Sequence, residues 1–202
     1  MIPRGSVGSG QATESRRVVW VPIVHTREDL GRLGKQVEAS YIRRLGRTRW
    51  EAHRKSIDHL WDEIRRWIEE LDLTPGRTRL YQDGLPICGQ EERIVRELAS
   101  QGSMNHRLLL DLMEKGARLM GTESPQLLLE EYELNRRILG ADRRAPGAGP
   151  GSDDIRGQAA RLLEARDRFI AGRVAETLEP GACGLVFLGR LHSLEGRLPQ
   201  DV

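Results

Sequence analysis

The 202-residue sequence has few of the features that mark secreted or membrane-spanning proteins. Its two cysteines, Cys88 and Cys183, belong to no CxxC pair, so neither a disulfide framework nor a cysteine zinc site is expected. No apolar run reaches the roughly 18–20 residues that a membrane helix needs. The first residues lack the apolar core of a signal peptide. We therefore expect a cytoplasmic protein without a membrane partner.

Aromatic residues and lysines are also scarce. Aromatic side chains make up 4% of the chain, and only three of its 32 basic residues are lysines. The formal net charge is +2, with acidic residues interleaved among the arginines. Nucleic-acid-binding domains instead tend to carry a concentrated basic stripe, so we expect no nucleic-acid partner.

What is present is a globular balance of 38% hydrophobic and 31% charged residues. Residues 1–15 stand apart because they are rich in Gly and Ser and include "PRGS", which resembles the remnant of an engineered protease site. We expect this segment to be a disordered arm or such a remnant. The length of the rest suits a single domain over residues 16–202.

Four apolar runs predict strands. The first and the fourth are nearly continuously apolar, which is typical of strands buried on both faces of a parallel sheet. The second and third are weaker patterns. The runs cover residues 18–26, 78–87, 117–124 and 184–193.

Helical periodicity fills the intervals between these runs. The clearest pattern extends from Trp50 to Leu71 and is ended by a Thr-Pro-Gly sequence. Strands that alternate with helices predict an α/β fold. We expect a mostly parallel central sheet of about four or more strands flanked by helices, with a helix-rich insertion after the first strand. The other predicted helices cover residues 91–100, 106–115, 125–139 and 154–178.

The helix between Trp50 and Leu71 contains three of the four tryptophans, at positions 50, 61 and 67. One interpretation is that this helix packs on its own sheet. The alternative is a homodimer surface, because large apolar patches are unusual on monomers.

A titratable residue follows each predicted strand. His25, Asp83, Glu123 and His192 end the four runs in that order. Each alone is explained by capping, turn formation or stabilisation of a helix N-terminus. However, ligands of parallel sheets bind beyond the carboxyl ends of the strands, so the four together predict a site at one sheet edge.

Arg166 adds a fifth candidate. It lies in the apolar stripe of the last predicted helix, four residues after Leu162 and four before Ile170, and this spacing directs it toward the sheet. A desolvated guanidinium needs acceptors. Arg166 then either pairs with a structural acid or extends to solvent, or it meets a carboxylate or a substrate oxyanion at the site.

The C-terminal part resembles a known signature. Arg166-Asp167, the sequence Gly189-Arg190-Leu191-His192, and Gly196 resemble the helix Arg-Asp pair and strand-terminal GxxH of the TraB/TIKI superfamily, which includes erythromycin-esterase-like and ChaN-like proteins.

The N-terminal half matches less closely. "VPIVHT" resembles the superfamily's other GxxH, with His25 in the histidine position and Pro22 in place of the glycine. Asp83 stands where the family usually has a glutamate. The resemblance implies an α/β core of two related halves with a site at the carboxyl edge of the sheet. The superfamily includes metal-dependent proteases, macrolide esterases and haem- or peptide-binding proteins, so it does not select a reaction.

Two function classes follow. In the first, the chain is a hydrolase of ester or peptide bonds with His25, His192, Arg166 and Asp83 as catalytic residues. It would either use a divalent metal (Zn, Mn or Co) held by His25, His192, Asp83 and Glu123, or act without metal through a histidine base. In the second, it is a non-catalytic regulatory protein that binds a metal, a small molecule or a peptide.

Overall fold

The computed structural model describes residues 15–29, 33–141 and 152–202. The predicted N-terminal arm, apart from Ser15, lies outside these residues. So does most of the segment between the last two predicted helices.

Four parallel strands form one sheet in the order β1-β4-β2-β3. This confirms the predicted α/β fold with a parallel sheet. Register pairs Trp20 of β1 with Val186 of β4, and Tyr81 of β2 with the same Val186, which makes β4 an interior strand. The strand bounds are Arg17–Ile23 for β1, Thr78–Gln82 for β2, Arg118–Met120 for β3 and Cys183–Gly189 for β4.

Each pair of sequence-consecutive strands is joined through two α-helices in the described residues, and a short 3-10 helix, Pro75–Arg77, precedes β2. The helix-rich insertion expected after the first strand is present as α1 and α2. The sequence analysis missed α1, although Val37, Tyr41 and Leu45 recur in it at four-residue spacing; the buried residues of this helix are Gly34 and Ser40. The bounds are Gly34–Leu45 for α1, Arg47–Glu69 for α2, Glu91–Ser100 for α3, Met104–Glu114 for α4, Pro125–Ala141 for α5 and Ser152–Thr177 for α6.

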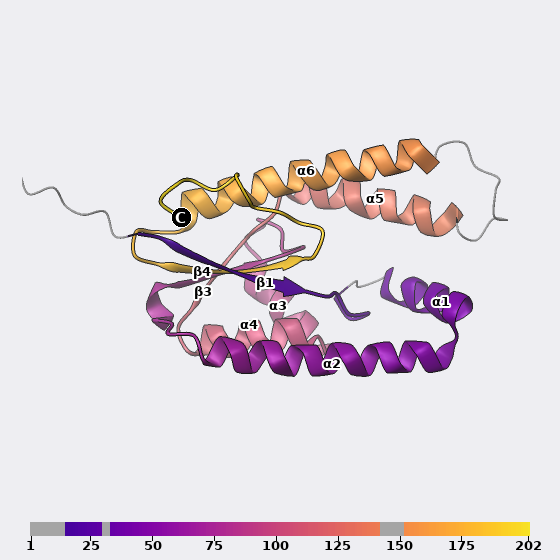
Figure 1. The fold of residues 1–202 in the computed structure, drawn as a ribbon, viewed down its shortest axis with the longest axis horizontal. Helices are drawn as coiled ribbons and strands as arrows, with labels where there is room; N and C mark the ends of the chain where they lie inside the picture. Colours follow the sequence, from indigo (N-terminus) through magenta and orange to yellow (C-terminus); the bar gives the residue numbers. More distant parts are fainter. Residues whose placement is uncertain (1–14, 30–32, 142–151) are drawn as a thin grey trace, which may run out of the picture.

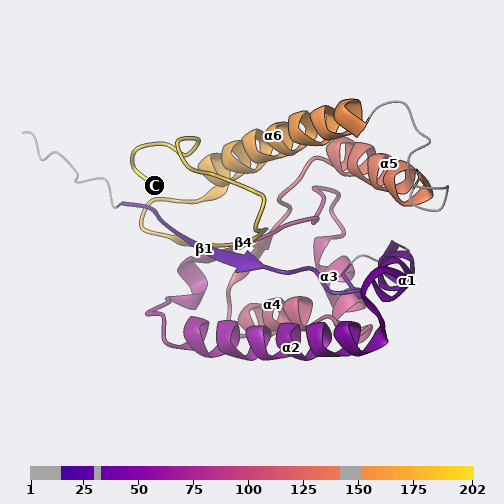
Figure 2. The ribbon, with the colours of Figure 1, turned by 45° about the vertical axis from the view of Figure 1, so that its right-hand side comes forward.

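The helices cover the sheet in two layers (Figures 1 and 2). Alternate residues of β4 face opposite layers, as the two-residue period of a strand requires. Leu185 and Phe187 join a core cluster with α2, α3 and α4, whereas Val186 and Leu188 join one with α6. The interior strands are therefore buried on both faces, and their carboxyl ends lie between the two helical layers.

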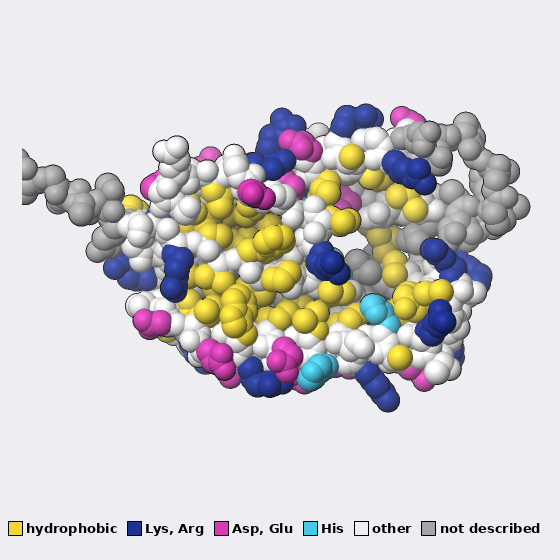
Figure 3. Space-filling model, in the orientation of Figure 1, with side chains coloured by type: hydrophobic (Ala, Val, Ile, Leu, Met, Phe, Trp, Pro, Cys, Tyr) yellow, Lys and Arg dark blue, Asp and Glu magenta, His cyan; other side chains and the backbone are white. Residues whose placement is uncertain are grey.

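β1 corrects the prediction that the first run is buried on both faces. It is an edge strand, and only one of its faces is fully buried. Val21 and Ile23 are buried against the α2 layer, but Trp20 on the other face is 49% exposed. Figure 3 shows hydrophobic side chains gathered over β1 and between β1 and α2. A continuous apolar run does not distinguish an edge strand from an interior strand.

The tryptophan-bearing helix packs on its own sheet. Trp50 and Trp61 are buried within the chain, and only Trp67 is partly exposed. The buried rings of Trp50 and Trp61 therefore give no support to a homodimer surface, which stays a prediction. None of the helices in the described part of the chain combines the length and the hydropathy that crossing a membrane would need.

Candidate functional site

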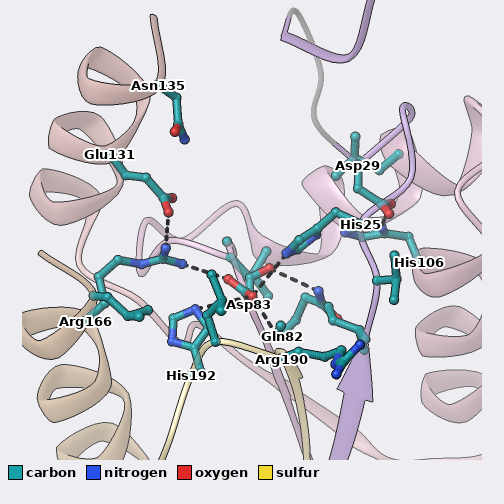
Figure 4. A pocket seen from close by; sticks show the side chains of 18 of the residues that line it. His25, Asp29, Gln82, Asp83, His106, Glu131, Asn135, Arg166, Arg190 and His192 are labelled. Atoms are coloured by element: carbon teal, nitrogen blue, oxygen red, sulfur yellow. Dashed lines mark hydrogen bonds and ion pairs between the residues drawn. The ribbon is translucent and has the colours of Figure 1, made fainter. Parts of the chain in front are cut away.

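The strand ends meet at one cavity of about 480 Å³. His25, Asp83 and His192 follow β1, β2 and β4, and they line it together with Arg166 from α6 (Figure 4). Glu123, which follows β3, lies directly behind Arg166 and is 1% exposed. The structure thus brings together all five residues that the sequence singled out.

Asp83 lies at the centre of this group. Its Oδ2 accepts a hydrogen bond from the Gly189 backbone N–H at 2.9 Å and lies 3.1 Å from His25 Nε2 and 3.4 Å from His192 Nε2. Its Oδ1 accepts from Arg166 Nη2 at 2.7 Å. Burial alone would raise the pKa of Asp83, but its bonds to His192 and His25 and their charges outweigh burial and hold the pKa well below its ordinary value. Asp83 is therefore ionised and acts as an acceptor.

The tautomer of His25 follows from this charge. Because ionised Asp83 can only accept hydrogen bonds, His25 Nε2 must carry the proton that joins the pair. Burial lowers the pKa of His25, but the hydrogen bond to Asp83 and the charges of Asp83, Asp29 and Glu131 raise it further, so the net shift is upward. The side chain is 33% exposed, which leaves this imidazole accessible from the cavity.

His192 has the same partner and a different environment. Its Nδ1 lies 2.6 Å from Asp167 Oδ1, and its side chain is only 4% exposed. Asp167 Oδ2 also accepts from the Ser193 backbone N–H at 3.1 Å. Burial lowers the pKa of His192, but Asp83 and then Asp167 raise it beyond the ordinary value. Asp167 stood in the recognised Arg-Asp pair, yet the sequence did not show that it binds the last histidine.

Arg166 faces the sheet as its helical spacing predicted, and its side chain is 4% exposed. Nε donates to Glu123 Oε2 at 2.6 Å, and Nη2 donates to Glu123 Oε1 and to Asp83 Oδ1, each at 2.7 Å. Nη1 donates to Glu131 on α5. Of the alternatives left open, Arg166 meets carboxylates of its own chain. Four of the five N–H groups of a guanidinium are thereby engaged.

Glu123 does not fit the role of metal ligand. Its Oε1 accepts from the Gly84 backbone N–H at 2.7 Å in addition to Arg166, and its Oε2 is held by Arg166. Within residues 15–29, 33–141 and 152–202, no group of three or more His, Cys, Asp or Glu side chains is arranged to hold a metal ion. The metal site therefore stays a prediction.

Glu131 is a site residue that the sequence reasoning missed. Its side chain is 37% exposed at the cavity, where it pairs with Arg166. Burial raises the pKa of Glu131, and the charges of Asp83 and Glu123 add to this against the opposing effect of Arg166. Asn135 lies one helical turn further on and also lines the cavity. The available signal was their i, i+4 spacing in a helix that had been predicted.

A second buried histidine fixes the segment after β1. His106 Nδ1 lies 2.7 Å from Ser103 Oγ and 3.3 Å from Asp29 Oδ1, and Ser103 Oγ also donates to Asp29. Asp29 Oδ2 accepts from the backbone and hydroxyl of Thr26, at 2.6 and 2.9 Å. In a hydrolytic triad, serine and aspartate occupy opposite ring nitrogens, whereas here both are at Nδ1. This network therefore anchors the segment that carries His25.

No family model, curated protein or solved structure matches this chain. The resemblance to the TraB/TIKI superfamily therefore stays a prediction.

Proposed function

We propose that this chain is a hydrolase of carboxylic esters or amides, peptides included, in which His25 is the general base. One observation carries the proposal: His25 Nε2 lies 3.1 Å from the ionised Asp83, while a third of the His25 side chain is exposed at a cavity of about 480 Å³. A carboxylate that orients an accessible imidazole is the arrangement from which histidine removes a proton from a nucleophile.

The reaction balances through one proton on His25. Neutral His25 keeps its Nε2–H on Asp83 and uses Nδ1 to take a proton from a water molecule. The hydroxide that forms attacks the substrate carbonyl carbon and gives a tetrahedral oxyanion. When this collapses, the bond to the alcohol or amine breaks, and His25 returns its proton to the leaving group. The products are a carboxylic acid and an alcohol or amine.

The other residues hold this pair and supply positive charge. His192 and the Gly189 N–H fix the position of Asp83. The Arg166 guanidinium lines the cavity. Its pairings with three carboxylates fix its orientation, and with it the direction of its one remaining N–H. A donor fixed in a low-dielectric site is worth more to a developing oxyanion than the same donor in water.

A non-catalytic binding role is the second candidate, and the charge balance of Arg166 favours it. Asp83, Glu123 and Glu131 all pair with this one cation, which weakens its attraction for an oxyanion. In this case the cavity would hold a small molecule or a peptide without turning it over.

Turnover of a panel of p-nitrophenyl esters and peptide anilides by the full chain separates the two. We expect His25→Ala to lower kcat/KM by about 10²- to 10⁴-fold, the usual contribution of a general base. His59→Ala is the matched control, because His59 is exposed on α2 and its ion pair within the described residues is with Glu63 at 3.8 Å. Full activity in His25→Ala would overturn the mechanism. A ligand that binds without turnover in any member of the panel would favour the binding role.

The metal prediction has its own test. Elemental mass spectrometry of protein purified without chelator is compared with that of the His25→Ala/His192→Ala double variant. The proposed mechanism predicts that chelation leaves ester turnover unchanged. Stoichiometric metal that disappears in the double variant, together with activity lost on chelation, would replace this mechanism with a metal-dependent one.

A further inference from the structure

A second cavity, of about 270 Å³, adjoins the site. It lies between the segment after β1, the helices α1 and α2, and the start of α4. His25 lines both this cavity and the larger one. The imidazole that we propose as the base therefore borders two cavities with different linings.

The second cavity has an aromatic wall. The ring centroids of Tyr41 and Trp50 are 5.2 Å apart and tilted by 56°. Tyr41 and His53 also lie 5.2 Å apart, but with ring planes only 13° from parallel. These separations are those of favourable aromatic pairs. Such a concentration stands out in a chain with 4% aromatic residues.

The polar edge of Trp50 is already satisfied. Its Nε1 donates to Glu38 Oε1 at 3.1 Å, and Glu38 Oε2 accepts from Arg27 at 2.9 Å. The indole therefore presents no unpaired donor to a ligand. Val37, Ile57 and Met104 complete the apolar part of the lining.

Packing of α1 on α2 explains only part of this arrangement. The three rings do join the two helices, but Tyr41 and His53 keep partial exposure at the cavity wall. The charged lining residues balance as two basic and two acidic side chains: Arg27, Arg54, Glu28 and Asp58. No net charge selects an ionic ligand, so the lining favours a neutral, flat and apolar group.

We infer that this second cavity binds an aromatic group of the substrate and thereby makes the chain selective for aryl or arylalkyl esters and amides. The inference rests on the proposed function. The aromatic half of the substrate stacks against Tyr41, the scissile carbonyl lies beside His25, and the polar half enters the larger cavity. Each of the three rings contacts the other two, but Trp50 is buried and His53 carries polar ring nitrogens. Tyr41 is therefore the specificity-determining residue, because it offers a partly exposed hydrocarbon ring face to the cavity.

Calorimetric titration of the full chain tests the binding part without any turnover. The probes are 2-naphthol and, as a non-aromatic counterpart, cyclohexanol. We expect 2-naphthol to bind the wild type more tightly than cyclohexanol does. Tyr41→Ala should weaken 2-naphthol about five- to tenfold, the order of a lost aromatic contact. Tyr132→Ala is the matched control, since Tyr132 on α5 lines neither cavity and contacts Arg136 instead.

The kinetic part uses 2-naphthyl acetate and ethyl acetate. Tyr41→Ala should raise KM for 2-naphthyl acetate. It should leave KM for ethyl acetate, which has no ring to place in the second cavity, at the wild-type value. Where Tyr41→Ala does not fold, Tyr41→Leu keeps most of the apolar volume and removes the ring. Equal binding of both alcohols, or unchanged 2-naphthol affinity in the Tyr41 variant, overturns the inference. If 2-naphthol binding depends on Tyr41 but the chain cleaves no ester, the aromatic site is supported and the proposed function is overturned.

Discussion

His25 and His192 end neighbouring strands and approach the same oxygen of Asp83, yet their surroundings differ. His25 follows the edge strand β1, and its side chain is 33% exposed. His192 follows the interior strand β4, is 4% exposed, and binds a second carboxylate, Asp167. Position in the sheet thus separates two similar residues into an accessible base and a buried support. Convergence of titratable groups at a sheet edge does not make them equivalent.

The largest expected effect comes from removing Arg166, the cation that pairs with the carboxylate shared by both histidines. Arg166→Leu leaves Glu123 buried without its counter-ion and removes the donor to Asp83 Oδ1. Breaking a buried pair in this way typically costs about 3–5 kcal/mol, so we expect a loss of that order in the free energy of unfolding, measured by urea denaturation. Arg168→Leu is the control, because Arg168 lies on the same helix and is exposed. Equal stability of the two variants would show that the carboxylates do not need Arg166.

Replacing each histidine separately sharpens the comparison. His192→Ala removes the donor to the buried Asp167 Oδ1, and an unsatisfied buried acceptor costs about 1–3 kcal/mol. His25→Ala also removes a donor to a buried carboxylate, but Asp83 keeps its bonds from Arg166 and the Gly189 N–H, so we expect a smaller loss, of about 0.5–1 kcal/mol. For ester turnover the order should be reversed: His25→Ala should lose more kcat/KM than His192→Ala does. Equal stability losses in urea denaturation would contradict the division into base and support.

Gly189→Ala tests the space that the two histidines share. A Cβ at this position would lie 2.9 Å from Asp83 Oδ2 and 3.7 Å from His25 Nε2. Because a Cβ atom cannot approach an oxygen this closely, the carboxylate must shift, and its hydrogen bond from the Gly189 N–H is disturbed. We expect a roughly tenfold loss of kcat/KM, equivalent to about 1.4 kcal/mol. Gly172→Ala on α6 is the control, since its Cβ would meet no atom within 4 Å. Unchanged ester turnover in Gly189→Ala would argue against a close His25–Asp83 pair.

The smallest expected effect is a pH dependence of stability. Both histidines have pKa values raised above 6.5 in the folded protein, so the folded state binds more protons than the unfolded state above that pH. Their stabilising contribution is complete below pH 6.5 and is lost as pH rises through the folded pKa values. The free energy of unfolding should fall over this interval by at most about 1.4 kcal/mol per pH unit for each proton. A His25→Ala/His192→Ala variant should show a flatter profile in denaturation series at each pH. A wild-type profile that rises over this interval would contradict the raised pKa values.

The sequence predicted the site where local rules determine the geometry. Strand ends place His25, Asp83 and His192 at one edge, and helical spacing directs Arg166 inward. Local patterns do not specify which element covers which. For that reason β1 was wrongly expected to be buried on both faces, and the contact of Glu131 with Arg166 was missed. The pairing of Asp167 with His192 likewise depends on how α6 docks on the sheet, which is a tertiary property.

The shared dependence of the two histidines on Asp83 is tested most directly by nitrogen-detected NMR titration of their imidazoles. The account predicts that both titrate with pKa values above 6.5 in the wild type, and that both values fall in Asp83→Asn. A histidine whose pKa does not change in that variant would contradict the claim that one carboxylate holds both.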